Sequence, residues 1–322
     1  MAPTSTARIG TELRHLVHEL GLLNRSCLNS GMSLSQVHIL TYINKNGPTP
    51  FAELQMQLGL EKGLLSRTVN ALRGRKYLRI VSNRADKRAK NIEILPAGTS
   101  AMRYAAKSTN STFGNILADC DESEWIKIYE ALKLLRLSAL RNNLTANPKR
   151  VRIEPLREAY FDSAMELITH IFSSEQNIPK RLVPISKSKR PKWWCARIGE
   201  DVIGVVAAWK EAGQWHWGRF AVDKNFRGLG IGNRMAVESI TALLTDVTDK
   251  IIIRARDIAI GIIEKLGGKQ TSPPFDFYGD PVTPMELEKE TFLQNPETFK
   301  RAAGISCEGF RNRSPHSSQT LD

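Results

Sequence analysis

Apolar residues recur at steps of three and four through the first part of the chain, a spacing typical of amphipathic helices. The pattern predicts helices from about Ile9 to Leu23, Leu34 to Ile43, Pro50 to Leu58 and Glu61 to Gly74. The last two are separated by a break at Gly59. Helix, glycine turn and helix after a preceding helix is the arrangement of a helix-turn-helix.

Small polar residues indicate where these helices begin. Ser33 or Ser35 is expected to cap the second helix, and Thr49 the third. After the fourth helix the sequence changes to a hairpin pattern. Its predicted strands, Tyr77–Val81 and Asn91–Leu95, flank a polar loop.

The rest of the chain predicts a second domain of α/β type. Helices over about Ala97–Leu117 and Glu122–Asn142 lead into a polar stretch at 143–150, which we interpret as a linker. Beyond it strands alternate with helices, and strands are expected at about residues 151–155, 193–198, 202–209, 215–222, 250–255 and 283–287.

The length supports more than one domain. The chain has 322 residues, whereas a typical domain has about 100–150. We expect a first domain at 1–146, a second at 147–303 and a disordered tail at 304–322.

Composition narrows the partners and the compartment. A net charge of +13 and a pI near 9.7 favour a polyanion, with nucleic acid first and an anionic membrane second. Residues 1–10 lack an apolar signal segment and no apolar run is long enough to span a bilayer, so we expect a cytoplasmic protein without membrane insertion. The four cysteines are widely separated, which favours reduced thiols and no structural metal.

Basic and polar residues gather on the fourth helix and the hairpin after it. Between Lys62 and Lys90, Lys and Arg recur throughout and Asp86 is the only acidic residue. Such a window is a footprint for phosphates, and polar residues on one helix face suit base edges in a major groove. The candidate DNA-binding residues are Lys62, Ser66, Arg67, Asn70, Arg73, Arg84, Asp86, Lys87, Arg88 and Lys90.

Three motifs in this region resemble the MarR family of winged helix-turn-helix regulators. They are the recognition-helix segment Leu58–Leu72, Asp86-Lys87-Arg88 as the Asp-x-Arg wing motif, and Leu95-Pro-Ala-Gly before the next helix. The resemblance implies a mainly-α domain that binds double-stranded DNA as a homodimer, with the first and last helices paired. His38 and Tyr42 would then line an effector crevice, or be ordinary surface and core residues.

A strand, a glycine turn and a helix follow one another from Trp215 to Ile240. Glycines 228, 230 and 232 allow the backbone to lie against a ligand, and the free N–H groups at the helix start suit phosphate. The spacing excludes both the dinucleotide pattern, because Asn233 stands at its last glycine, and the P-loop.

The spacing Val222-x-x-x-x-Arg227-x-x-Gly230-x-Gly232 resembles the acetyl-CoA signature of the GNAT N-acetyltransferases, and the element order over about 151–290 resembles that fold. The resemblance implies an α/β domain with a central mixed, mostly antiparallel sheet, acetyl-CoA as cofactor and an amine acceptor. It also implies a set of cofactor-binding residues, namely Phe220, Val222, Arg227, Gly228, Leu229, Gly230, Ile231, Gly232, Asn233 and Asp257.

The resemblance also suggests which groups move protons. His216 stands where the family often places its general base, and a histidine is suited to that task. Alternatively, His216 packs structurally between two tryptophans. Ile263 stands where a Tyr commonly protonates the leaving thiolate, and Tyr278 is the candidate substitute. Otherwise the acid is water, or activity is slow, or the domain binds acetyl-CoA without turnover.

Three functions of the second domain remain open from the sequence. The first is transfer of an acetyl group to a small amine, the second is transfer to a protein lysine, and the third is non-catalytic sensing of acetyl-CoA that modulates DNA binding. The domain is rich in tryptophan, which indicates either core packing or an aromatic wall for an apolar or cationic amine.

Overall fold

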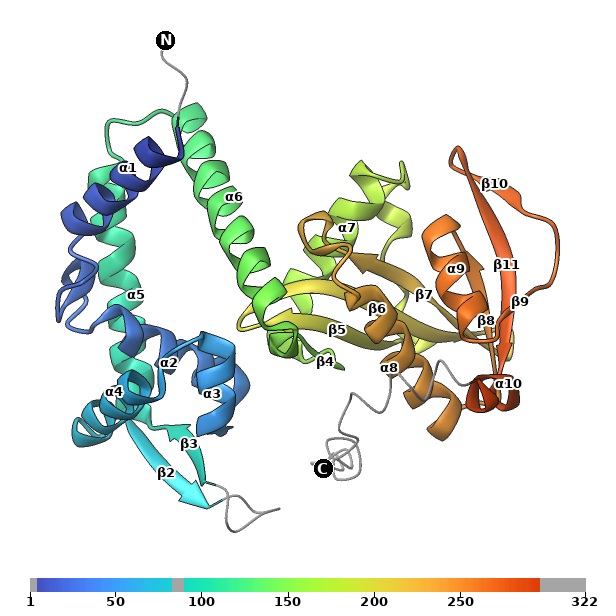
Figure 1. Ribbon diagram of the computed structural model, residues 1–322, viewed down its shortest axis with the longest axis horizontal. Coiled ribbons are helices and arrows are strands. Elements are labelled where there is room, and N and C mark those ends of the chain that lie inside the picture. The colour runs from blue at the N-terminus through green and yellow to red at the C-terminus, as the bar shows by residue number, and fades with distance from the viewer. Residues whose placement is uncertain (1–4, 83–89, 296–322) are drawn as a thin grey trace, which may run out of the picture. The chain divides into compact units, whose positions relative to one another are not determined.

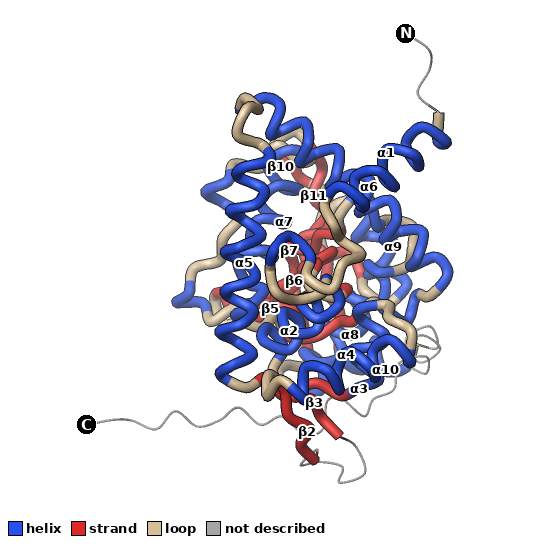
Figure 2. Tube along the Cα trace, turned by 90° about the vertical axis from the view of Figure 1, so that its left-hand side faces the viewer, coloured by secondary structure: helices blue, strands red, loops and turns tan. Residues whose placement is uncertain are grey.

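The computed structural model describes residues 5–82 and 90–295, and the chain divides into two compact units, Met1–Leu140 and Arg141–Asp322 (Figure 1). Helices make up most of the first unit, whereas the second contains a large sheet (Figure 2). The predicted tail at 304–322 lies outside the described residues. Within the described ranges, no helix combines the length and the apolar character that a membrane span requires.

The first unit is a helical domain with a small three-stranded sheet. Its helices are α1 (Thr6–Glu19), α2 (Leu34–Asn46), α3 (Phe51–Leu58), α4 (Lys62–Gly74), α5 (Pro96–Ile116) and most of α6 (Glu122–Ala146), whose last residues, from Arg141, belong to the second unit. Its strands are β1 (Thr49–Pro50), β2 (Leu78–Ser82) and β3 (Lys90–Ile94), in the order β1-β3-β2. This arrangement confirms the predicted winged helix-turn-helix.

The N-terminus of α2 has the side-chain cap that the sequence predicts, whereas that of α3 does not. Ser33 caps α2, and its hydroxyl and the Gln36 side chain form a complete capping box. The expected cap at Thr49 is wrong. Thr49 lies in β1 opposite Ile92 of β3, its hydroxyl donates to the Gly47 carbonyl, and α3 begins after Pro50. Pairing with the hairpin has displaced the helix start by one residue.

The apolar stripe of α4 holds the helix-turn-helix together. Leu65, Val69 and Leu72 are buried against Leu40 and Leu54, which lie on α2 and α3. The 3.6-residue period of α4 therefore directs its polar residues to the opposite face.

Gly98 in α5 provides a test of this packing. A Cβ built on Gly98 would lie 2.3 Å from the backbone oxygen of Tyr77, whereas a Cβ on Gly114 of the same helix meets nothing within 4 Å. We expect Gly98→Ala to lower the free energy of unfolding by about 2–4 kcal/mol, because the backbone of Tyr77 must shift. Gly114→Ala should be neutral or stabilising by up to about 1 kcal/mol. Thermal unfolding of both variants checks this, and equal effects would contradict it.

The second unit is built on one sheet in the order β10-β11-β8-β7-β6-β5-β4. Its strands are β4 (Arg152–Pro155), β5 (Lys192–Ile198), β6 (Asp201–Glu211), β7 (Gln214–Val222), β8 (Lys250–Ala255), β9 (Lys269–Gln270), β10 (Phe275–Phe277) and β11 (Asp280–Glu288). β7 and β8 pair in parallel and the other pairs are antiparallel, as predicted.

Helices cover both faces of this sheet. α7 (Phe161–Ser174) packs on the face that carries Ala221 of β7, and α8 (Ile231–Asp246) packs on the face that carries Trp217 and Phe220. α9 (Asp257–Lys265) and α10 (Lys289–Gln294) lie at β8 and β11 (Figure 1). The short β9, β10 and α10 were not predicted, because two- to six-residue elements carry too little periodicity.

Candidate functional site

The candidate DNA-binding residues of α4 share one face. Lys62, Ser66, Arg67, Asn70 and Arg73 are all exposed, as predicted from the helical period. Among the residues that the structure describes, no side-chain partner occupies these groups. Two arginines and a lysine on one open helix face are therefore available to an anion.

The wing is only partly described. Lys90 is exposed at the start of β3, whereas Arg84, Asp86, Lys87 and Arg88 lie outside the described residues. Arg79, on β2, is ion-paired with Glu93 on β3 at 2.7 Å. Glu93 therefore competes with DNA phosphates for the Arg79 guanidinium.

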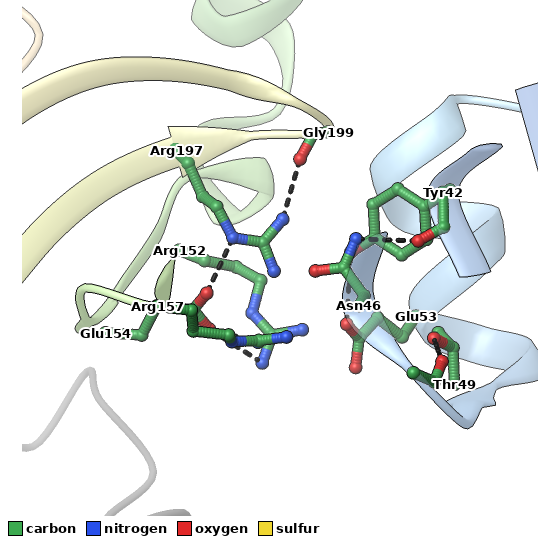
Figure 3. Close-up of polar contacts among 10 residues, drawn as sticks. Tyr42, Asn46, Thr49, Glu53, Arg152, Glu154, Arg157, Arg197 and Gly199 are labelled. Carbon is green, nitrogen blue, oxygen red and sulfur yellow. Dashed lines mark hydrogen bonds and ion pairs between the residues drawn. The ribbon is translucent and has the colours of Figure 1, made fainter. Parts of the chain in front are cut away.

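Tyr42 is a core residue. Its side chain is fully buried, its hydroxyl donates to Glu53 of α3 at 3.1 Å, and its carbonyl accepts from Asn46 at 2.8 Å (Figure 3). His38 is exposed one turn earlier. Tyr42 is thus a core residue and His38 a surface residue. This arrangement agrees with the alternative in which neither residue binds an effector.

The predicted phosphate turn in the second unit has the backbone that its glycines suggest. Gly228 and Gly230 have φ of 80° and 74°, and Gly230 caps α8. A Cβ on either would meet nothing within 4 Å, so the backbone of the turn faces open space. In the described part of the chain, the successive N–H groups from Gly228 to Asn233 donate to no protein acceptor. Donors in this pattern suit a phosphate.

Two arginines hold the turn in place. Arg227 donates to the Val222 carbonyl and forms an ion pair with Glu175 at 2.7 Å. Arg141 donates to the carbonyls of Asn225 and Arg227. Two of the N–H donors of Arg227 are thus engaged by the protein, and the backbone N–H groups of the turn face open space. Asp257 is exposed at the first position of α9.

Strands β7 and β8 part beside this turn. Their parallel pairing in the described chain is limited to Trp215–Trp217 opposite Ile251–Ile253. Beyond it, β7 stays paired with β6 through a bulge at Arg219 and Phe220. The edge of β7 that faces β8 is therefore unpaired from Gly218 to Val222, and it leads directly to the glycine turn.

A cavity of about 540 Å³ lies where β7 and β8 separate, a place that we call the fork. His216, Trp217, Gly218, Arg219 and Phe220 of β7 line one part of it, and Ile253 and Arg254 of β8 line another. Its volume is in the range of small-molecule sites, about 300–1,000 Å³. Phe220 also packs over Gly232, since a Cβ there would lie 3.1 Å from its ring. The cavity and the start of α8 thus meet at Phe220.

His216 lies in the wall of this cavity. Its ring stacks on Trp209 with centroids 5.7 Å apart and an interplanar angle of 16°. Burial lowers the pKa of His216, the Glu211 carboxylate raises it, and the cations of Arg254 and Lys189 lower it further, with a net decrease. The imidazole is therefore neutral at neutral pH and able to accept a proton.

The structure does not bring Tyr278 to this site. It lies in the turn between β10 and β11 at a φ of 57°, with its ring edge-on to Phe277. Phe277 lines the cavity, but Tyr278 is not among the described lining residues. Ile263 is fully buried, and its Cγ2 would lie 2.3 Å from a Cβ on Gly268. Ile263 is thus a packed core residue.

The sequence did not single out two arginines of this region. Arg197 is fully buried, donates to Glu154 at 2.6 Å and to the Gly199 carbonyl, and connects β5 to β4 (Figure 3). Burial alone would raise the pKa of Glu154, but Arg197 and its neighbouring arginines hold it below its ordinary value. This cluster is structural. Arg219, in contrast, lines the cavity.

Comparisons with known proteins assign each region to a family. Residues 30–89 match the MarR family and residues 158–289 match the acetyltransferase (GNAT) domain. The chain therefore joins a MarR-type DNA-binding domain to a GNAT acetyltransferase domain, as its motifs indicated, and the GNAT fold implies use of an acyl-CoA.

Three solved structures that match this chain each cover less than half of it. ElaA from Escherichia coli is 14% identical over 43% of this chain and 99% of that one, with a TM-score of 0.39. An acyl-CoA N-acyltransferase from Pseudomonas aeruginosa is 15% identical (42% and 97% covered, TM-score 0.37). A transcriptional regulator from Thermotoga maritima is 28% identical (42% and 94% covered, TM-score 0.30). No match was found among curated proteins.

Proposed function

We propose that this protein is a homodimeric DNA-binding regulator whose second unit transfers an acetyl group from acetyl-CoA to an amine, with a small molecule as acceptor. The observation that carries the proposal is the arrangement along β7. A neutral histidine, a cavity and an unpaired strand edge lead in turn to a glycine loop with open N–H groups.

The homodimer is supported by apolar side chains that the single chain leaves exposed. α1 exposes Ile9, Leu13 and Leu16, and α6 exposes Trp125 and Tyr129 among others. Exposed apolar faces of this kind are typical of subunit interfaces. Pairing of these helices would place two copies of α4 on one DNA site.

Acetyl-CoA fits the residues at the fork. The N–H groups of 228–233 would hold its pyrophosphate, and the unpaired edge of β7 at Phe220 and Val222 would hold its pantetheine arm. When bound, it supplies an activated acetyl group, which leaves sulfur as the C–S bond breaks and joins the amine nitrogen as the C–N bond forms.

A charge placed in the glycine turn tests this site. We expect Gly228→Asp to weaken acetyl-CoA binding at least about tenfold in calorimetric titrations, because a carboxylate would face the pyrophosphate. Gly213→Asp is the matched control. Gly213 has a φ of 81° against 80° for Gly228, has equally open space, and lies in the β6–β7 turn. Equal loss in both variants would show that strain rather than charge is responsible.

His216 is assigned the proton that the ammonium must lose before its nitrogen can attack. The leaving thiolate gains a proton, for which we assign water, because Ile263 and Tyr278 do not present an acid to the cavity. The buried Ile263 is also the observation that favours the second candidate function, a domain that binds acetyl-CoA as a sensor without turnover.

The pH dependence follows from the pKa of His216. Because burial lowers this pKa from 6.5, kcat/KM should fall with decreasing pH only below 6.5, as the imidazole gains a proton. Glu211→Gln should move this acid limb to still lower pH, since Glu211 is the largest contributor that raises the pKa. Glu264→Gln, on the surface of α9, serves as control. A limb that stays in place or rises in Glu211→Gln would contradict the assignment.

A further inference from the structure

The cavity at the fork contains more positive charge than its own residues neutralise. Its described lining contains Lys189, Arg219, Arg254 and Arg256 but a single carboxylate, that of Glu211. Lys189 is paired with Glu211 at 2.5 Å, and Arg256 is paired with Asp280 and donates to the Phe277 carbonyl. Among the described residues, no acidic partner pairs with Arg219 or Arg254.

Arg219 has an unusual backbone conformation, and its side chain is fixed by two hydrogen bonds. It lies in the β7 bulge with a φ of 54°, a backbone conformation rare for a long side chain. Its Nε donates to the Val183 carbonyl at 2.9 Å and its Nη2 to the Leu182 carbonyl at 2.7 Å. A guanidinium has five N–H donors, so these two bonds fix the group and leave further donors for a ligand.

Two aromatic rings lie near this guanidinium. Arg219 lies 5.6 Å from the ring of Trp209 and 6.0 Å from that of Phe172. Burial lowers the pKa of Arg219, opposed by Glu211, so a further anion beside it would stabilise the charged form. Trp209 already contacts Arg219 and His216, which argues against a site for a purely cationic amine.

We propose that the acceptor is an amine that also carries a carboxylate and an apolar or aromatic body, such as an aromatic α-amino acid, and that Arg219 binds its carboxylate. The proposal rests on the proposed function, since it takes this cavity as the acceptor site. Arg254, on the other arm of the fork, adds positive charge on the side of His216. The apolar body would pack against Phe172, Trp209 and Phe277.

The test compares two amines that differ only in a carboxylate. L-phenylalanine and 2-phenylethylamine are titrated into the full-length protein in the presence of CoA, followed by calorimetry. We expect phenylalanine to bind at least about tenfold more tightly, because a charge-assisted bond to a guanidinium is strong. The preference should fall to near unity in Arg219→Gln and be partly retained in Arg219→Lys, with unfolding temperatures measured to confirm folding.

The outcomes separate the inference from the function on which it rests. If Arg219 only clamps Leu182 and Val183, its substitution weakens both amines equally and the preference survives, which overturns the inference. Absence of phenylalanine binding, or preference for 2-phenylethylamine, also overturns it. If phenylalanine binds through Arg219 but acetyl-CoA releases no thiol with any amine, the acceptor site stands and the proposed transfer fails.

Discussion

Replacing His216 with Gln should reduce amine-dependent release of CoA thiol by about 10²–10⁴-fold in kcat, the usual contribution of a general base. Gln keeps a polar side chain of similar size beside Trp209 but accepts no proton at neutral pH. The loss should appear in kcat and leave acetyl-CoA binding intact, because the phosphate turn lies at the far end of β7. Steady-state kinetics and titrations on the same preparation check both.

A surface histidine provides the control. His170 lies exposed on α7 of the same unit, and His170→Gln should behave as wild type. If His216→Gln retains its rate, then His216 is a packing residue of the Trp209 stack and the proton leaves through water.

DNA affinity should fall by about 10³-fold or more as salt rises from about 50 to about 200 mM, if each α4 face and wing contacts several phosphates. Arg67→Ala should weaken binding by about 1–3 kcal/mol if it reads a base, or lower the salt slope by about one if it contacts a phosphate. Fluorescence anisotropy with labelled double-stranded DNA, at several salt concentrations, distinguishes these results.

Lys127→Ala is the matched control for Arg67→Ala. Lys127 is an exposed cation near the start of α6. α6 follows the C-terminal end of α5, whereas the hairpin precedes the N-terminal end of α5. It should leave both affinity and slope nearly unchanged. Affinity that does not depend on salt would contradict the DNA-binding role.

The parts of the fold that follow from local periodicity were predictable. The buried residues Leu65, Val69 and Leu72 of α4 determine which face of the helix is polar. The glycine spacing at 228–232 indicated a turn, and Gly228 and Gly230 do have positive φ. The resemblance to the GNAT pattern placed Ile263 at the position of the usual acid. What the sequence did not indicate is that Ile263 packs so tightly beneath Gly268 that no side chain fits there.

The features that depend on long-range pairing were not predictable. Thr49 has the chemistry of a cap, but its pairing with Ile92 across the hairpin decides its conformation. Arg219 stands in a strand sequence where alternation suggests nothing unusual, and only the bulge against β6 turns it to the cavity. Tyr278 is near Ile263 in sequence, but the β10–β11 turn places it outside the cavity lining.

Release of free thiol from acetyl-CoA, measured with wild-type protein against a panel of amines that includes aromatic amino acids, tests the central claim most directly. We predict release that requires an amine and yields the N-acetylated acceptor in equal amount. Tight acetyl-CoA binding with no amine-dependent release would contradict acetyl transfer and favour a domain that senses acetyl-CoA.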